Sequence, residues 1–254
     1  MFQSLVVVVG EAFYSVYCIL PLERALRFVK HAVEKVESPS PITISSQLII
    51  LRTNEHEQGI EISLHELGEK LAFTYSSRLI FLHEKDYRNL VLLQSIDNEN
   101  IYGLEKNYAA GNIGELLNAG SIAKGLSVRY VGYVGSIYVG YGLFAERDIN
   151  NGDFIGEYTG LVRESVKNEE DNAYSFVYPS SECSYDINAK EYGSVIRFIN
   201  HHSISPNVEF KRVFHEGLMH IVCFAITDIS KDSQLLVDYG AAYWVNKRYC
   251  PVVL

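Results

Sequence analysis

The sequence predicts a mostly β domain from about residue 126 onward, preceded by a smaller α+β unit over residues 1–125. After Gly125, short apolar segments alternate with glycine and Asn/Asp turns, which is typical of compact β domains. Twelve of the 18 tyrosines lie in this second part, as expected for an aromatic-rich core or a narrow channel. At 254 residues and 48% hydrophobic content, the chain has enough apolar material for a packed core.

The first 125 residues predict a mixture of strands and helices. Residues 1–20, MFQSLVVVVGEAFYSVYCIL, predict a buried strand followed by connecting chain; no Lys or Arg precedes the apolar run and Glu11 interrupts it, so an export signal or anchor is the less favoured alternative. Helical spacing begins at Pro21 and ends before Ser38-Pro39. Residues 42–52, 78–83 and 88–96 predict strands, and residues 63–73 predict a short helix.

Composition excludes several classes of function. The chain carries 22 basic and 31 acidic side chains, a net charge of −9, so direct nucleic-acid binding is not expected and a basic partner is favoured. The four cysteines form no CxxC pair, which argues against a zinc cluster or a disulfide framework and favours a reducing compartment. His65-Glu66 begins like the HExxH zinc signature, but residue 69 is Glu, so an exposed helix face is the preferred interpretation.

A glycine motif opens the β-rich part. Residues 140–145, GYGLFA, match the GxGxxA dinucleotide fingerprint, but no helix fits before the turn at residues 150–153. Residues 139–160 are therefore predicted as a β-hairpin whose glycines let a ligand approach the backbone. Another hairpin turn is predicted at residues 216–217, with His215 and His220 facing solvent. Arg197-Phe198-Ile199 is predicted as a core strand that runs into the polar loop NHHSISPN.

Four segments resemble, in order, the motifs of SET-domain protein lysine methyltransferases. They are residues 140–160, 172–179 (NAYSFVYP), 185–210 (YDINAKEYGSVIRFINHHSISPNVEF) and 235–244 (LLVDYGAAYW). The resemblance implies a SET domain over residues 126–245, with residues 246–254 as a short tail. It also implies a knot-like active site in which the RFINH and DYG segments cross.

The resemblance also implies roles for individual residues. Tyr239 would be the catalytic tyrosine, and S-adenosylmethionine would be the cofactor, with no metal. Val237, two positions earlier, is smaller than the Tyr or Phe often found there, which favours di- or trimethylation. The cofactor would be held by Gly140, Tyr141, Gly142, Arg197, Asn200, His201 and Trp244, and the substrate lysine channel would be lined by Tyr158, Tyr174, Val237 and Tyr243.

The sequence departs from the family pattern in two places. Asn200 and Asn207 are seven positions apart instead of six, which leaves open whether His201 or His202 meets the cofactor. Only Cys250 lies in the tail, so the cysteine-rich zinc segment of many relatives is not expected, as in compact bacterial or chlamydia-type proteins. The tail, the N-terminal unit or a second copy in a homodimer would then close the channel.

The predicted function is methyl transfer to a lysine of a basic protein, such as a histone or a histone-like protein. The alternatives are a SET-fold binding or adaptor module with little activity, and a purely structural role for the tyrosines. The expected location is a soluble, reducing compartment: the cytoplasm, or a host cell or nucleus for a secreted bacterial effector. No membrane association is expected.

Overall fold

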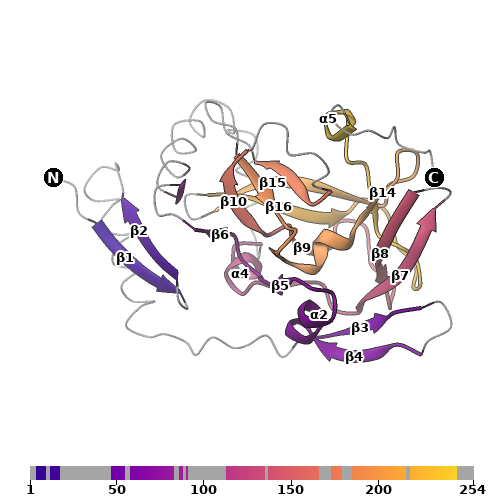
Figure 1. Cartoon of the computed structure of the whole chain (residues 1–254). Coiled ribbons are helices and arrows are strands. Elements are labelled where there is room, and N and C mark those ends of the chain that lie inside the picture. The colour runs from indigo at the N-terminus through magenta and orange to yellow at the C-terminus, as the bar shows by residue number, and fades with distance from the viewer. Residues whose placement is uncertain are drawn as a thin grey trace.

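A computed structural model describes residues 4–9, 12–17, 47–54, 58–82, 86–87, 90, 113–134, 137–165, 173–178, 185–215 and 218–244. Short strands dominate this part of the chain, which confirms the mostly β fold class (Figure 1). They form several small sheets instead of one large one. Within the described residues, no helix is long and apolar enough to cross a bilayer.

The N-terminal strands form a hairpin. Strand β1 (Ser4–Val9) pairs antiparallel with β2 (Ala12–Tyr17). The strand predicted at the start of the chain is confirmed, but residues 12–17 form a second strand where connecting chain was predicted. The helix predicted from Pro21 lies outside the described residues.

Helix α2 (Leu64–Lys70) confirms the helix predicted in this region. Ser63 caps it: the Ser63 hydroxyl accepts a hydrogen bond from the Glu66 backbone N–H, and the Glu66 carboxylate accepts one from the Ser63 N–H at 2.8 Å. His65 and Glu69 face solvent, with side chains 71% and 65% exposed. The predicted exposed helix face is therefore confirmed.

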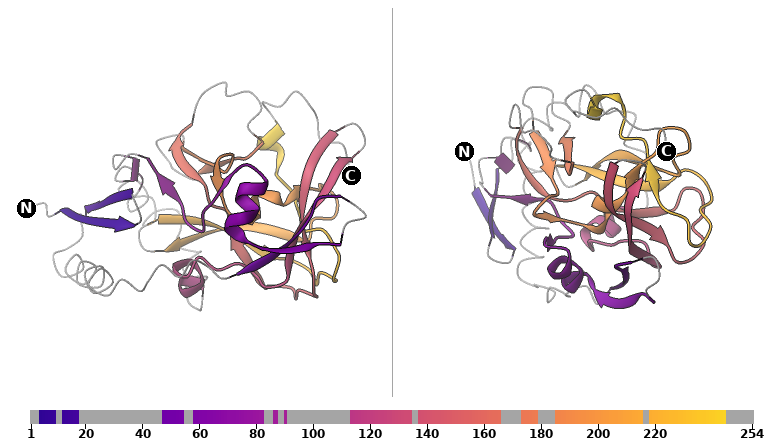
Figure 2. Two further views of the ribbon diagram at one scale, coloured as in Figure 1. Left: turned by 60° about the horizontal axis from the view of Figure 1, so that its bottom comes forward. Right: turned by 45° about the vertical axis from the view of Figure 1, so that its right-hand side comes forward.

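One of the two four-stranded sheets has the order β4-β3-β7-β8. Its strands are β3 (Leu48–Arg52), β4 (Ile60–Ser63), β7 (Leu126–Val134) and β8 (Ile137–Ala145). Strand β3 runs parallel to β7, so strands from both sides of residue 125 share this sheet. Figure 2 shows α2, β3 and β4 lying together along one side of the β-rich body.

Two further parallel pairings connect early and late residues. Strand β5 (Thr74–Tyr75) pairs with β13 (Tyr192–Gly193), and β6 (Ile80–Phe81) pairs with β10 (Leu161–Glu164). Strand β10 continues the sheet to β12 (Tyr185–Asn188) and β11 (Ser175–Tyr178). Residues 47–82 therefore supply strands to the same sheets as later residues, and the domain boundary at residue 125 stays a prediction.

A three-stranded sheet has the order β15-β16-β9, with β9 (Phe154–Glu157), β15 (Val208–His215) and β16 (Leu218–Ala225). The β15–β16 pairing confirms the predicted hairpin around residues 216–217. The hairpin predicted over residues 139–160 is wrong, because β8 pairs with β7 and β9 pairs with β16. The turn at residues 150–153 is real, but it sends the chain to a different sheet.

Helical segments replace strands at two predicted places. Arg197 and Phe198 end the 3-10 helix η2 (Val195–Phe198), so the predicted RFI core strand is wrong in conformation, although Phe198 and Ile199 are buried as expected. Leu90, the one described residue of 88–96, is helical and buried, against the predicted strand. The other helices are α4 (Ile113–Asn118) and α5 (Ala241–Trp244).

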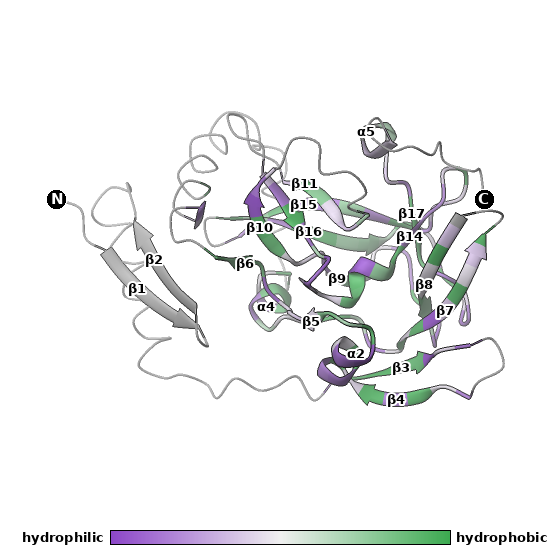
Figure 3. Cartoon of the chain, in the orientation of Figure 1, coloured by the Kyte–Doolittle hydropathy of each residue, from purple (hydrophilic) through white to green (hydrophobic). Residues whose placement is uncertain are grey.

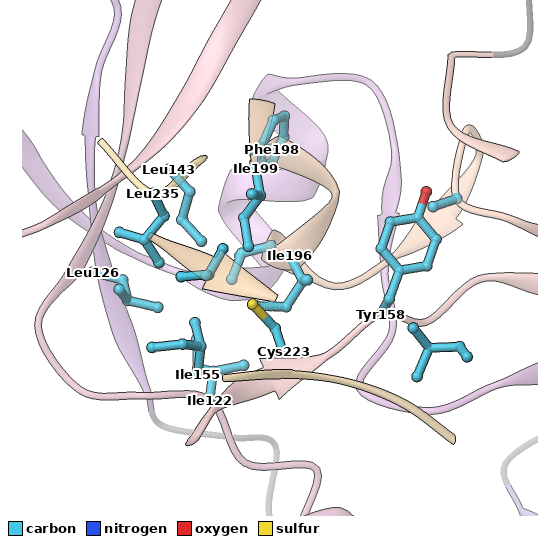
Figure 4. Close-up of a cluster of buried hydrophobic side chains, with 14 of the residues drawn as sticks. Ile122, Leu126, Leu143, Ile155, Tyr158, Ile196, Phe198, Ile199, Cys223 and Leu235 are labelled. Carbon is cyan, nitrogen blue, oxygen red and sulfur yellow. The ribbon is translucent and has the colours of Figure 1, made fainter. Parts of the chain in front are cut away.

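The larger of two hydrophobic clusters in the described residues joins the three- and four-stranded sheets. Hydrophobic residues recur along the strands, whereas α2 carries hydrophilic residues (Figure 3). Figure 4 shows the centre of this core, where Leu143, Ile155, Ile196 and Leu235 come from four separate segments of the chain. All four side chains are at most 1% exposed. The core thus holds together the segments that carry the candidate site.

Candidate active site

The segments RFINH and LLVDYG lie side by side. Strand β14 (Asn200–His201) runs parallel to β17 (Leu236–Val237), with His201 opposite Val237. The His202 N–H donates to the Val237 carbonyl at 3.0 Å. On the other side, residues 233–235 hydrogen-bond to residues 143–145 of β8. The segment 233–237 is therefore inserted between β8 and β14, as the predicted crossing requires.

Asn207 holds residues 233–237 in place through three hydrogen bonds. Its Nδ2 donates to the Gln234 carbonyl at 2.8 Å, and its Oδ1 accepts from the Leu236 N–H at 2.8 Å. Its backbone N–H also donates to the Leu236 carbonyl at 2.9 Å. The last asparagine of the polar loop is thus a structural clamp.

The two histidines of the loop have different environments. His202 Nδ1 accepts hydrogen bonds from the backbone N–H groups of Ile204 and Ser205, at 3.2 and 2.9 Å, so it closes its own loop. His201 is buried, with 8% exposure, and its Nδ1 accepts from the Tyr239 N–H at 3.1 Å. His202 thus holds the backbone of its own loop, while His201 faces inward.

His201 leaves one polar atom unpaired. Burial lowers its pKa, although Asp238, at 3.7 Å, opposes that shift. Because Nδ1 accepts a hydrogen bond, the neutral ring carries its proton on Nε2. This Nε2 is buried and has no hydrogen-bond partner among the described residues. A buried unpaired donor is costly, so it fits a bound acceptor such as a polar group of a cofactor.

Tyr239 lies at the crossing of the two segments. Its hydroxyl donates to the Ile199 carbonyl at 2.7 Å, and burial raises its pKa well above the usual value. Its ring lies 5.3 Å from the His201 ring and 4.6 Å from the Tyr243 ring, centroid to centroid. The hydroxyl is thus fixed and protonated, with its oxygen lone pairs able to accept a hydrogen bond.

Tyrosines gather around Tyr239. The Tyr158 hydroxyl donates to the Tyr174 carbonyl at 2.7 Å, and burial raises the Tyr158 pKa. The Tyr243 hydroxyl donates to the Ala173 carbonyl at 3.3 Å. The electrostatic interactions of Tyr239 are with Tyr243, Tyr158 and Tyr174. The structure therefore brings these predicted channel residues together; their contact with a substrate lysine stays a prediction.

Two phenylalanines extend this cluster and were missed by the sequence analysis. Phe176 on β11 and Phe210 on β15 pack against the Tyr158 ring, at 5.4 and 5.8 Å between centroids. Phe176 lies in the NAYSFVYP segment, two residues after Tyr174, so strand alternation could have placed it on the same face. Phe210 carried no signal that separates it from a core aromatic.

The glycine segment contributes mainly backbone. The Asn200 Nδ2 donates to the Tyr141 carbonyl at 3.1 Å, which ties β8 to β14. The Tyr141 ring packs edge-to-face on Tyr130 and Phe198, at the border of the core. Gly140 has a φ of +73°, which L side chains rarely adopt. At Gly142, an added Cβ would lie 2.4 Å from the Gln234 Nε2, so a protein side chain occupies that space.

Two more predicted cofactor residues differ in their surroundings. The Trp244 ring in α5 lies 5.0 Å from the His201 ring, centroid to centroid. The Arg197 guanidinium instead lies among aromatic rings, with its Cζ 4.1 Å from the centre of Tyr174 and 4.4 Å from that of Phe73. Trp244 and His201 thus form the part of the site that fits a cofactor, and Arg197 lies against the tyrosine cluster.

The prediction that His215 and His220 face solvent is wrong. His220 Nδ1 lies 2.7 Å from the carboxylate of buried Glu157, and the His220 side chain is 16% exposed. His215 Nε2 lies 3.2 Å from Asn118 Oδ1. Both partners come from distant parts of the chain, which explains why the local turn pattern gave no sign of them. No cluster of three or more metal-ligating side chains occurs among the described residues.

Comparison with protein families adds the decisive observation: the SET domain model matches residues 140–240. The chain contains a SET domain. The matched range includes the glycine segment, the polar loop and Tyr239. It also includes residues 233–237, which are inserted between β8 and β14.

Curated relatives of the SET domain are much longer than the matched region. Histone-lysine N-methyltransferase 2B of Homo sapiens is 37% identical over 123 residues, which are 46% of this chain and 4% of that protein. The variant-silencing SET domain-containing protein of Plasmodium falciparum is 27% identical over 234 residues, 79% of this chain and 9% of that protein. The H3 lysine-9 specific SUVH3 of Arabidopsis thaliana is 33% identical over 135 residues, 40% of this chain and 20% of that protein.

A solved structure is also similar to the SET domain. The complex described as ctPRC2 in an autoinhibited conformation bound to S-adenosylmethionine is 29% identical, with a TM-score of 0.41. The match covers 49% of this chain and 16% of that one.

Proposed function

We propose that this SET domain transfers a methyl group from S-adenosylmethionine to the side-chain amine of a lysine in a basic protein, such as a histone or a histone-like protein. The observation that carries the proposal is the position of Tyr239. The Tyr239 ring contacts both the ring of His201, whose Nε2 is an unpaired donor, and the ring of Tyr243 in the tyrosine cluster. A cofactor site and a lysine site that both adjoin Tyr239 suit direct methyl transfer.

The cofactor side of the site is polar at one point and aromatic at another. His201 Nε2–H would donate to a polar group of the cofactor, and the Trp244 ring would pack beside it. S-adenosylmethionine, when bound, supplies a methyl group on a sulfonium sulfur, which a neutral amine can attack. Tyr141 would help indirectly, because its carbonyl holds the Asn200 amide.

The lysine side must receive a neutral amine. A free lysine has a pKa of about 10.4, so it is almost fully protonated at neutral pH. A channel of tyrosine and phenylalanine rings removes water and disfavours the charged ammonium form. Tyr239 is itself held protonated by burial, so it acts as a hydrogen-bond acceptor that aligns the amine.

The proposed substrate is a basic protein because the chain has a net charge of −9. The match covers only 4%, 9% and 20% of the three curated relatives described above, so the substrate protein and its lysine are left to direct test. Two of them carry names as histone-lysine methyltransferases.

The test uses methyl-labelled S-adenosylmethionine with core histones and other basic proteins. We expect label on lysine with wild type and a loss of at least about 100-fold with Tyr239→Phe, since a preorganised hydrogen bond at a reacting centre contributes about that much. Tyr133→Phe is the matched control, because Tyr133 is 67% exposed on β7.

Calorimetry with S-adenosylmethionine separates the alternatives. Cofactor binding without label on any basic protein would favour a binding or adaptor module. Absence of cofactor binding would contradict the proposal and the assigned role of His201.

A further inference from the structure

Arg197 is a partly buried cation whose guanidinium lies among aromatic rings. Its Cζ lies 4.1 Å from the ring centre of Tyr174, 4.4 Å from that of Phe73 and 5.4 Å from that of Phe198. Its Nε and Nη1 atoms are buried and have no hydrogen-bond partner within the described part of the chain. Ring faces attract a cation but do not neutralise its charge.

Another described arginine shows the contrast. Arg129 Nη2 lies 2.8 Å from the Glu146 carboxylate and 2.7 Å from that of Asp232. No carboxylate among the described residues forms such a pair with Arg197. The pKa of a guanidinium is so high that the group stays charged even when burial lowers that pKa, as burial does for Arg197. The charge of Arg197 therefore acts on whatever lies near it.

What lies near it is the tyrosine cluster. The charge of Arg197 acts on Tyr158 and Tyr174, and hydrogen bonding to Tyr174 partly offsets the lowering of the Arg197 pKa. Both tyrosines also interact with Tyr239. Arg197 thus lies behind the wall of the proposed lysine channel.

The other titratable groups around the channel do not cancel this charge. Burial raises the pKa values of Tyr158, Tyr239 and Tyr243, so they are neutral near pH 7. Asp186 is already engaged by Arg163, at 3.3 Å, and by the Ser175 hydroxyl, at 2.7 Å. Three more groups are Tyr75, whose hydroxyl is buried and whose pKa is raised; His201, whose pKa is lowered; and Asp238, whose side chain is 52% exposed.

We propose that Arg197 lowers the pKa of the substrate lysine in the channel and so promotes loss of its proton to solvent before methyl transfer. The inference rests on the proposed function. Arg197 acts through space, across the Tyr174 ring, and does not touch the reacting atoms. It is therefore a positioning residue, and what it sets is the protonation state of the substrate lysine. The neutral amine then forms the N–C bond with its lone pair, while the C–S bond breaks and sulfur keeps that electron pair.

The expected size follows from distance. An ammonium on the opposite face of Tyr174 would lie about 8 Å from the guanidinium, since a cation over a ring lies about 4 Å from its centre. At an effective dielectric constant of about 20, repulsion over this distance shifts a pKa by on the order of one unit.

The test is the pH profile of kcat at saturating peptide and S-adenosylmethionine, because kcat reports groups in the enzyme–substrate complex. For Arg197→Met we expect the acid limb of the kcat profile to move to higher pH by about one unit. The variant should then have a kcat about 10-fold below that of wild type at pH 7, and this difference should shrink at high pH. Arg197→Lys, which keeps a cation, is the matched control and should move the limb much less. Calorimetry should show cofactor affinity within about threefold of wild type for both variants.

If Arg197 had only a structural role, Arg197→Met would lower kcat by the same factor at every pH and would leave the acid limb in place. That result would overturn the inference and leave the proposed function intact. Absence of methylation by wild type would overturn both.

A second measurement needs no variant. The pKa of a 13C-labelled substrate lysine is followed by NMR in the wild-type complex with S-adenosylhomocysteine, whose sulfur is neutral. We expect a value at least about one unit below that of the free peptide. A value equal to or above that of the free peptide would overturn the inference, even if Arg197→Met fails to fold.

Discussion

Replacing Asn207 with alanine should destabilise the protein strongly, although Asn207 lies in a polar loop. The change removes the Nδ2 donor to the Gln234 carbonyl and the Oδ1 acceptor for the Leu236 N–H, both at 2.8 Å. The backbone hydrogen bond from the Asn207 N–H to the Leu236 carbonyl is retained.

The magnitude follows from two hydrogen bonds and the groups that they leave behind. Each lost hydrogen bond costs about 1 kcal/mol net, and each backbone group left partly unpaired adds to that cost. We therefore expect a decrease of about 2–4 kcal/mol in the free energy of unfolding. For a chain of this size, each kcal/mol lowers Tm by about 2–4 °C, so Tm should fall by about 5–15 °C.

Urea unfolding and calorimetry measure this loss. Asn151→Ala is the matched control, since Asn151 is exposed in a turn, and its variant should stay within about 0.5 kcal/mol of wild type. Asn207→Asp keeps the acceptor for Leu236 and should fall between the two. A loss below about 1 kcal/mol for Asn207→Ala would refute the reasoning, because it would mean that water replaces the amide at no cost.

Three further substitutions test other parts of the structure. Val237→Tyr fills a position that is 3% exposed; we expect mass spectrometry to show monomethyl product replacing higher products, and an unchanged product distribution would contradict the predicted room in the channel. Tyr75 has a buried hydroxyl without a partner among the described residues, and burial raises its pKa to about 12, so wild type should lose roughly 2–3 kcal/mol of stability as pH rises from 10 to 12. Tyr75→Phe should be at least as stable as wild type and should lack this part of the stability loss at alkaline pH. If the free energy of unfolding fell equally with pH in both proteins, the raised pKa of Tyr75 would not be its cause. Gly160→Ala would place a Cβ 2.5 Å from the backbone oxygen of Asn188, so we expect a loss above about 2 kcal/mol in urea unfolding, and wild-type stability would show that β12 can move.

Local sequence patterns predicted the elements better than their partners. The glycine segment and FIGE were both recognised as strands, but the short turn between them suggested a hairpin that does not form. Alternation of apolar residues shows that a strand exists and which face is buried, whereas the choice of neighbour depends on residues far away in the chain. The parallel pairing of β3 with β7 could not be predicted for the same reason.

The candidate site shows the same limit. The polar loop and the DYG segment were predicted to cross, and the structure brings Asn200, His201 and Tyr239 together. The pairing of His220 with Glu157 was missed, because a histidine beside a turn gives no sign of a carboxylate on another strand. The aromatic enclosure of Arg197 was missed too, since Phe73 lies in a part of the chain with no recognisable motif.

The insertion of residues 233–237 between β8 and β14 also bears on how the protein folds and opens. Its neighbours, residues 143–145 and 200–201, precede it by long stretches of chain, and contacts of such separation form slowly. This segment should therefore enter late in folding, after the sheets on either side exist. Because Tyr239 follows directly, the site is completed only by that last step, and partial unfolding that releases the segment would remove the site while leaving most of the core in place. A ligand bound beside His201 should accordingly slow hydrogen exchange at the Leu235 and Leu236 amides more than elsewhere in the protein.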